Sequence, residues 1–296
     1  MKLIYYQENK NFGDALNPYI FNRLLPNFFD EEPSSIFLGI GSILQFRFPE
    51  AKKKIVFSTG YAYGKPPILD SSYDIQCVRG PLTAKKLKMD TKLAITDGAA
   101  LLKTFSFPKK TKTIKVAFMP HHESALFYDW KKVCEIVSFQ YINPLDDFEK
   151  ILQTILSSEL IITEAMHGAI VADVFRVPWV PLKLYPLINE FKWQDWTASL
   201  QLKYKPNYCK PLYDITATQQ KVKTRLKADN FLTKNLSKVY FNYQEMIKKD
   251  KLLKDFEGLK NAPSFLSNEP VLDVKVAQLQ EKISVIQKKY SRINML

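Results

Sequence analysis

The stretch Leu160–Phe175, which reads LIITEAMHGAIVADVF, joins a short apolar run to a segment rich in small residues. Leu160–Thr163 has the pattern of a buried strand, residues 164–166 fit a turn, and His167–Phe175 fits a helix that packs closely on a sheet. A strand followed directly by a helix is the repeating unit of α/β proteins with parallel sheets. The stretch therefore predicts an α/β fold, with His167 near a helix amino terminus.

Short apolar runs alternate with amphipathic stretches on both sides of this unit, which predicts two mostly parallel sheets. The expected strands are Leu3–Tyr6, Ile36–Ile40, Ile55–Ser58, Ile75–Val78 and Leu93–Thr96, then Ile114–Met119, Ile136–Ile142, Leu160–Thr163 and Trp179–Leu184. A lysine-rich connector, Phe107–Lys112, separates the two series. We expect doubly wound, Rossmann-like domains at 1–108 and 114–255 that face a cleft, and a linker with an amphipathic helix in 256–296.

Composition indicates an ordinary globular protein of 296 residues, 46% hydrophobic and 25% charged. Cys77, Cys134 and Cys209 are odd in number and show neither paired nor metal-ligand spacing, which favours reduced cysteines in the cytoplasm. The first apolar run is too short for a signal peptide, and no segment approaches the roughly 18 apolar residues that span a bilayer. We therefore expect a soluble or peripheral protein.

The chain carries 43 Lys and Arg against 30 Asp and Glu, a net charge of +13, which favours anionic partners. No recognisable nucleic-acid-binding module is present, so nucleic acid is not an expected partner. Basic residues in the last third form either a solvated helix face or a docking surface that can contact a membrane peripherally. They are Lys221, Lys223, Arg225, Lys227, Lys248, Lys249, Lys251 and Lys254.

An apolar stripe with helical spacing follows the linker at 258–270. Its members are Val276, Leu279, Ile283, Ile286, Tyr290 and Ile293. Such a stripe can pair with another helix, which includes homo-oligomer formation, lie on an anionic membrane, or fold back over the chain itself. The sequence leaves these alternatives open.

All three histidines follow expected strands, where the loops of parallel sheets collect reactive groups. The helix dipole favours a neutral His167 that also lies near bound anions, and Glu164 would draw it back toward protonation, which suits proton transfer. His121 and His122 are neighbours in an expected extended segment, so only one should reach a ligand. Satisfied structural histidines are the alternative. Ser-His-Asp hydrolysis is disfavoured because no Gly-x-Ser-x-Gly occurs.

Arg79 is the strongest anion-clamp candidate in the first half, because VRGPLT places its guanidinium at a strand end beside a helix start. A surface ion pair is the alternative explanation. Gly13 suits a tight turn after the first strand, Asp14 is expected to cap the next helix, and Asp97 is also assigned to capping. Asp195 is an acceptor-sugar candidate within an aromatic and charged cluster.

Seven segments together resemble the bacterial polysaccharide pyruvyl transferases, particularly the branch that forms ketals on exopolysaccharides. They are NFGD, GIGS, VRGPLTAKKL, ITDGAALL, MPHHES, EAMHGAIVADVFRVPWVP and FKWQDWTASL, and the resemblance runs from about Lys2 to Leu200. It implies a two-domain fold of the glycosyltransferase-B type that moves an enolpyruvyl unit from phosphoenolpyruvate onto a sugar. One departure is Ala99-Ala100 after Asp97-Gly98, where relatives often have a proline after the aspartate.

The resemblance and the residues lead to one mechanistic hypothesis, in which His167 is the general acid and base, Arg79 clamps the anionic donor and Glu164 orients the histidine. Replacing His167 or Arg79 by alanine should then abolish transfer and leave the fold intact. Further expected substrate-binding residues are Asn11, Gly13, Asp14, Gly41, Ser42, His121, His122, Met166, Gly168, Lys192 and Asp195.

No metal or cofactor is required by this scheme, since phosphoenolpyruvate is a donor substrate. The acceptor would be a sugar or lipid-linked oligosaccharide of a capsule, exopolysaccharide or lipopolysaccharide, handled in the cytoplasm or at the inner face of the membrane. Two alternatives stay open. One is a nucleotide-sugar glycosyltransferase of the same architecture, and the other is a non-catalytic basic module that binds polysaccharide or nucleic acid.

Overall fold

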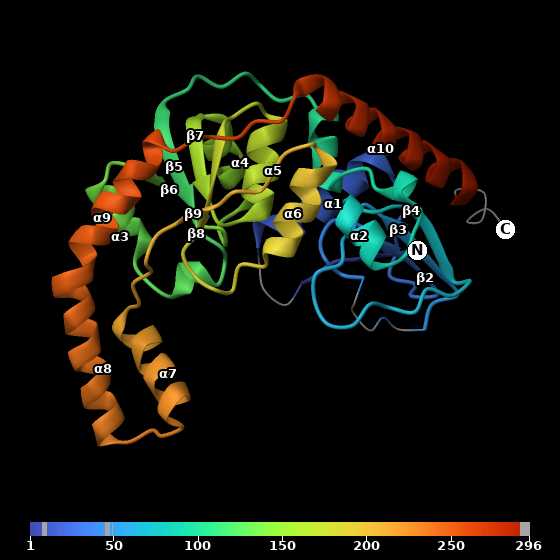
Figure 1. Ribbon diagram of the computed structural model, residues 1–296. Coiled ribbons are helices and arrows are strands. Elements are labelled where there is room, and N and C mark those ends of the chain that lie inside the picture. Colours follow the sequence, from blue (N-terminus) through green and yellow to red (C-terminus); the bar gives the residue numbers. More distant parts are fainter. Residues whose placement is uncertain (8–10, 45–47, 49, 291–296) are drawn as a thin grey trace.

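The computed structural model describes residues 1–7, 11–44, 48 and 50–290 and shows an α/β protein with two parallel sheets. The first sheet and its helices occupy one side of the molecule in Figure 1, and the second sheet occupies the other. Residues 106–113 connect the two without a helix or strand. The expected α/β class with parallel sheets is therefore confirmed, and the domain limits stay a prediction.

The first sheet has the strand order β1-β2-β3-β4, which is also the order along the chain. Its strands are β1 (Lys2–Ile4), β2 (Ser35–Leu38), β3 (Lys53–Phe57) and β4 (Tyr73–Cys77). The order never reverses, so the expected doubly wound arrangement was wrong for this sheet. The strand expected at Leu93–Thr96 was also wrong, because Asp90 caps a 3-10 turn at Thr91–Leu93 and leaves a single bridge, Val78 to Ala94.

The second sheet has the order β6-β5-β7-β8-β9 and is doubly wound as expected. Its strands are β5 (Ile114–Met119), β6 (Gln140–Tyr141), β7 (Ser158–Thr163), β8 (Trp179–Lys183) and β9 (Asn207–Tyr208). Strand order reverses between β5 and β7, and ligands of such sheets bind at the carboxyl ends of the strands around that switch. The strand expected at Ile136–Ile142 is shorter, because Asp129 caps a helix that runs to Ile136.

Helices cover both sheets and fill the last third of the chain. They are α1 (Phe12–Leu24), α2 (Pro81–Lys86), α3 (Trp130–Ile136), α4 (Phe148–Leu156), α5 (Met166–Val174), α6 (Glu190–Ser199), α7 (Ile215–Leu226), α8 (Phe231–Tyr243), α9 (Lys249–Gly258) and α10 (Glu269–Tyr290). Short 3-10 turns include η2 (Gly98–Thr104), and a π-helical turn joins α8 to α9. None of the described helices is both long and apolar enough to span a bilayer.

The amphipathic tail helix folds back over the first half of the chain, which decides among its three alternatives. The stripe residues from Val276 to Tyr290 are buried in the main core of the protein, and Figure 1 shows α10 along the outside of the first half. At its end, Lys289 Nζ lies 2.8 Å from Asp74 Oδ2. The stripe is thus a packing surface, and Ile293 lies outside the described residues.

Candidate active site

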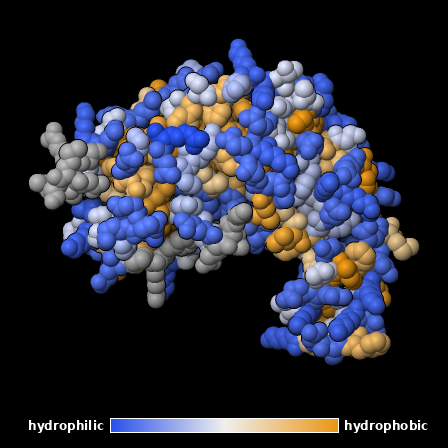
Figure 2. Space-filling model, turned by 180° about the vertical axis from the view of Figure 1, so that it is seen from behind, coloured by the Kyte–Doolittle hydropathy of each residue, from blue (hydrophilic) through white to orange (hydrophobic). Residues whose placement is uncertain are grey.

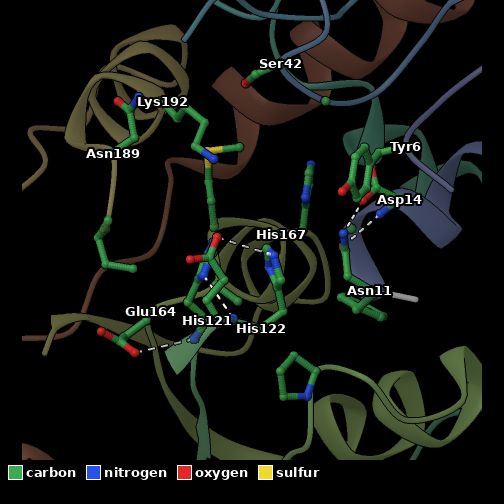
Figure 3. Close-up of a pocket in the computed structure, with 18 of the residues that line it drawn as sticks. Tyr6, Asn11, Asp14, Ser42, His121, His122, Glu164, His167, Asn189 and Lys192 are labelled. Carbon is green, nitrogen blue, oxygen red and sulfur yellow. Dashed lines mark hydrogen bonds and ion pairs between the residues drawn. The ribbon is translucent and has the colours of Figure 1, made fainter. Parts of the chain in front are cut away.

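A cavity of about 720 Å³ opens at the switch point of the second sheet. His121 and His122 follow β5, and His167 follows β7, whose last residue Thr163 pairs with Met119 of β5. Residues from the first half close the opposite wall. Of the residues expected at a site, the cavity is lined by Asn11, Gly13, Asp14, Gly41, Ser42, His121, His122, Glu164, Met166, His167 and Lys192. Figure 3 shows their arrangement.

His167 is the second residue of α5, and no side chain caps the start of this helix. Its Nε2 lies 3.6 Å from Asp97 Oδ2, and this carboxylate caps η2 through its other oxygen, which accepts from Ala99 N. Nε2 and Oδ2 are both buried and have no hydrogen-bond partner among the residues that the structure describes. The geometry suits an imidazolium paired with a carboxylate, since a charge gain on the ring would draw the two atoms together.

Glu164 does not contact the imidazole of His167, so its expected role in orienting that ring was wrong. The carboxylate accepts from Leu184 N at 2.8 Å and from His121 N at 3.4 Å, and Figure 3 draws the second of these bonds as a dashed line. Burial raises the pKa of the Glu164 carboxyl to about 7. Through these two hydrogen bonds Glu164 holds the loops after β5 and β8. The carboxylate that faces the His167 ring is that of Asp97 instead.

His121 and His122 both line the cavity, and the expectation that only one of them reaches a ligand stays a prediction. The chain turns at His122 instead of staying extended, and the two rings lie with centroids 4.2 Å apart. Burial lowers the pKa of His121 to about 3 and also lowers the pKa of His122, which keeps both rings neutral. Together with Glu123 they present ligand atoms within 4.8 Å of one another, a set that could hold a divalent cation.

The start of α1 forms the wall of the cavity beside His167. Asn11 caps this helix by accepting from Asp14 N at 3.1 Å, so the cap expected at Asp14 was wrong. The Asp14 side chain instead accepts a hydrogen bond from Asn11 Nδ2 and lines the cavity. Burial raises the pKa of Asp14, and His167, Asn11 and Lys192 partly offset that effect.

Arg79 does not reach the cavity, which corrects its expected role as a direct anion clamp. Its side chain is fully buried, and Nε donates to Asp195 Oδ2 at 3.1 Å. Asp195, which was expected to bind the acceptor, is equally buried and also accepts from Thr83 N and Thr83 Oγ1. Arg79 Nη1 donates to Ser42 Oγ at 2.8 Å, so the guanidinium positions a residue that does line the cavity.

Lys192, on α6, supplies the cavity with a cation. It is the one Lys or Arg among the described lining residues, and its Nζ lies 5.0 Å from the centroid of the Tyr63 ring. Asn189, which caps α6 and donates to Ala62 O at 2.8 Å, lies beside it. The sequence did not single out Tyr63 or Asn189, although an asparagine just before a helical segment is a recognisable cap.

Met166 and Gly168, both in the first turn of α5, were expected to bind substrate, and only one of them lines the cavity. Met166 lines the cavity. Gly168 does not, because it faces the sheet, where an added Cβ would lie 2.7 Å from Met119 Sδ. Gly168 therefore allows α5 to approach β5, and a substrate contact through its backbone stays a prediction.

Comparison with known proteins matches residues 5–184 to the family model described as polysaccharide pyruvyl transferase. The chain belongs to this family. Over 208 residues it is 39% identical to the succinoglycan biosynthesis protein ExoV of Rhizobium meliloti (strain 1021). The aligned part is 68% of this chain and 66% of that protein. A functionally uncharacterised protein of known structure from Klebsiella pneumoniae subsp. pneumoniae NTUH-K2044 is 14% identical, with a TM-score of 0.38, over 71% of this chain and 93% of its own.

The matched region contains both strands of the switch point and ends one residue after β8. It therefore includes His121, His122, Glu164 and His167, as well as Asp97. Lys192 lies outside it. The family resemblance expected from the seven sequence segments is thereby confirmed.

Proposed function

We propose that this protein transfers a pyruvyl group from phosphoenolpyruvate to two hydroxyls of one sugar in a bacterial surface polysaccharide or its precursor. One observation carries the proposal: His167 stands in a cavity at the switch point with its Nε2 against the Asp97 carboxylate. The family membership and the name of the R. meliloti relative support pyruvyl transfer in exopolysaccharide synthesis.

The donor carries a phosphate and a carboxylate, and the cavity offers two features that favour anions. The amino terminus of α5 has no side-chain cap, so its first N–H groups and the positive end of its dipole are left for a ligand. The second is the ammonium group of Lys192, which also lines the cavity. We assign donor binding to these two features in place of Arg79.

In the proposed reaction, protonated His167 gives its proton to the methylene carbon of phosphoenolpyruvate, which makes the adjacent carbon electrophilic. A sugar hydroxyl bonds to that carbon, and its proton returns to His167. The imidazolium then gives this proton to the bridging oxygen as the carbon–oxygen bond to phosphate breaks, and the neutral imidazole accepts the proton of the second hydroxyl as that hydroxyl closes the ketal. Asp97 would stabilise the imidazolium in both stages, and such proton transfer typically contributes about 10²- to 10⁴-fold in rate.

We further propose a two-domain arrangement of the glycosyltransferase-B type. The cavity has one wall from the first half, which includes Asn11 and Ser42, and another from the second half, which includes His121 and His167. A donor and an acceptor could therefore be held from opposite sides. The acceptor would be a sugar or a lipid-linked oligosaccharide.

The test is sugar-dependent phosphate release from phosphoenolpyruvate, with mass spectrometry of the glycan product. We expect His167→Ala to lose at least about 100-fold in turnover while it keeps the wild-type unfolding transition. Wild-type turnover by the folded variant would remove His167 from the mechanism. Release of nucleoside diphosphate from an activated sugar, without phosphate release from phosphoenolpyruvate, would instead support a glycosyltransferase.

A further inference from the structure

Helices α7 and α8 form a hairpin that projects from the body of the protein. Residues 227–230 join the two helices, and Figure 1 shows both reaching well beyond the second sheet. A projecting pair of helices gains little burial from the rest of the fold, so its stability depends on the contact between the two helices.

The hairpin buries polar side chains and exposes apolar ones. Thr218, Thr233 and Ser237 are its buried residues, and Ser237 Oγ donates to Thr233 O at 2.7 Å. In contrast, Phe231 is 80% exposed and Leu232 is 63% exposed. Helices that pack in water normally bury their apolar face, so this exposed apolar surface indicates a binding partner.

The exposed apolar residues begin at the tip of the hairpin and continue along α8. They are Leu226, Phe231, Leu232, Leu236, Val239 and Tyr243, followed by Met246 and Ile247 in the π-helical turn. Figure 2 shows hydrophobic and hydrophilic groups side by side over the projecting hairpin. Patches of this kind on a soluble surface usually mark a binding site.

The charge of the hairpin identifies the class of partner. Residues 215–243 carry six basic side chains and one acidic side chain, Asp229, which pairs with Lys223 at 2.7 Å. The six basic side chains are all exposed: Lys221, Lys223, Arg225, Lys227, Lys234 and Lys238. Exposed apolar residues among Lys and Arg favour the interface of an anionic bilayer, where the apolar groups enter the acyl boundary and the cations meet lipid phosphates.

We propose that the α7–α8 hairpin docks the protein on a bilayer that contains anionic phospholipid, with Phe231 and Leu232 inserted at the tip. In Figure 1 the start of α6, whose residues line the cavity, lies on the side of the body from which the hairpin projects. Docking would therefore bring the cavity toward the membrane surface. This inference stands independently of the proposed chemistry, because it rests on the hairpin alone.

Co-sedimentation of the full-length protein with vesicles of phosphatidylcholine, with and without phosphatidylglycerol, tests the proposal. We expect binding to the anionic vesicles that weakens with salt, and an affinity at least about tenfold lower for Phe231→Glu/Leu232→Glu. Ile68→Glu changes an apolar residue that is 90% exposed outside the hairpin and should bind like the wild type. No binding of the wild-type protein to anionic vesicles would overturn the proposal.

A second pair of variants tests the basic residues. Lys234→Glu/Lys238→Glu should bind at least about tenfold more weakly, whereas Lys109→Glu/Lys110→Glu, which changes the net charge equally in the exposed connector, should not. If both double variants lost vesicle binding equally, net charge alone would explain the loss, and the assignment to the hairpin would be overturned. A dimer, seen without vesicles, that Phe231→Glu/Leu232→Glu dissociates would overturn it as well, because a second copy would then cover the patch.

Discussion

Gly13 and His167 meet so closely that a Cβ added to Gly13 would lie 2.1 Å from His167 Nδ1. On the other edge of the ring, Nε2 faces Asp97 at 3.6 Å. Gly13 and Asp97 both belong to the first half of the chain, whereas His167 lies in the first turn of a helix of the second half. The catalytic histidine that we propose is therefore held between two residues of the opposite half, which couples its orientation to how the halves pack.

Gly13→Ala should impair turnover much more than stability. The new methyl group would collide with the imidazole, and the imidazole can rotate away because it is a side chain that is 17% exposed at the cavity. A displacement of about 1 Å can cost roughly 100-fold in rate, so we expect a loss of about that size with a nearly unchanged unfolding midpoint. Gly258→Ala, where a Cβ would have no neighbour within 4 Å, is the matched control. Wild-type turnover in Gly13→Ala would show that the ring position is not critical.

Asp97→Asn should lower turnover by about 100-fold or more, because the amide cannot stabilise an imidazolium as a carboxylate does. Asparagine is an equally good helix cap and can keep the hydrogen bond from Ala99 N, so stability should change little. Asp90→Asn makes the same substitution at the cap of another 3-10 turn, where Asp90 accepts from Lys92 N, and should leave turnover unchanged. If both variants turn over like the wild type, Asp97 is only a cap.

Arg79→Ala should destabilise the fold by about 3–5 kcal/mol, contrary to the sequence-based expectation of an intact fold, since it leaves the buried Asp195 carboxylate without its cation. Asp195→Ala should lower the free energy of unfolding by a similar amount. The double variant should lower it by clearly less than the sum of the two, because neither buried charge is then left without its partner. Lys115→Ala, which breaks an exposed pair with Glu159, should cost less than about 1 kcal/mol. Denaturant unfolding of the four variants measures these differences. Strictly additive effects would contradict a coupled pair.

The sequence predicted the parts of the site that depend on local pattern. A strand, a turn and a helix of small residues place His167 at the start of α5, and the apolar run before His121 and His122 is β5 to the residue. The carboxyl ends of neighbouring parallel strands must share an edge of the sheet. The convergence of the three histidines on one cavity therefore followed from the pattern.

The sequence could not predict which partner each charged group would find. Arg79 follows the end of a strand, as an anion clamp would, but its guanidinium contacts Asp195, which lies 116 positions away on α6. Asp97 shows only a cap signal in the sequence, because His167 reaches it through the packing of the two halves. Pairings of this kind depend on tertiary geometry, which the local periodicity of the sequence does not encode.

Glu164→Gln should change how stability depends on pH. Burial raises the pKa of the carboxyl from 4.5 to about 7, so the folded state holds this proton more tightly than the unfolded chain. The contribution of Glu164 to the free energy of unfolding is therefore fully present below pH 4.5 and declines as the pH rises toward 7, by roughly 3 kcal/mol in all.

Glutamine has no such proton to lose and can still accept from Leu184 N, so the difference in unfolding free energy between wild type and variant should fall from pH 4.5 to 7 and then level off. Chemical denaturation at steps across this range measures the difference. Glu159→Gln, on an exposed residue of the same strand, should give a difference that does not follow this profile. A wild-type minus Glu164→Gln difference that stays flat from pH 4.5 to 7 would mean that the buried carboxyl titrates as it does in the unfolded chain, and that its role in holding the β5 loop does not depend on its charge.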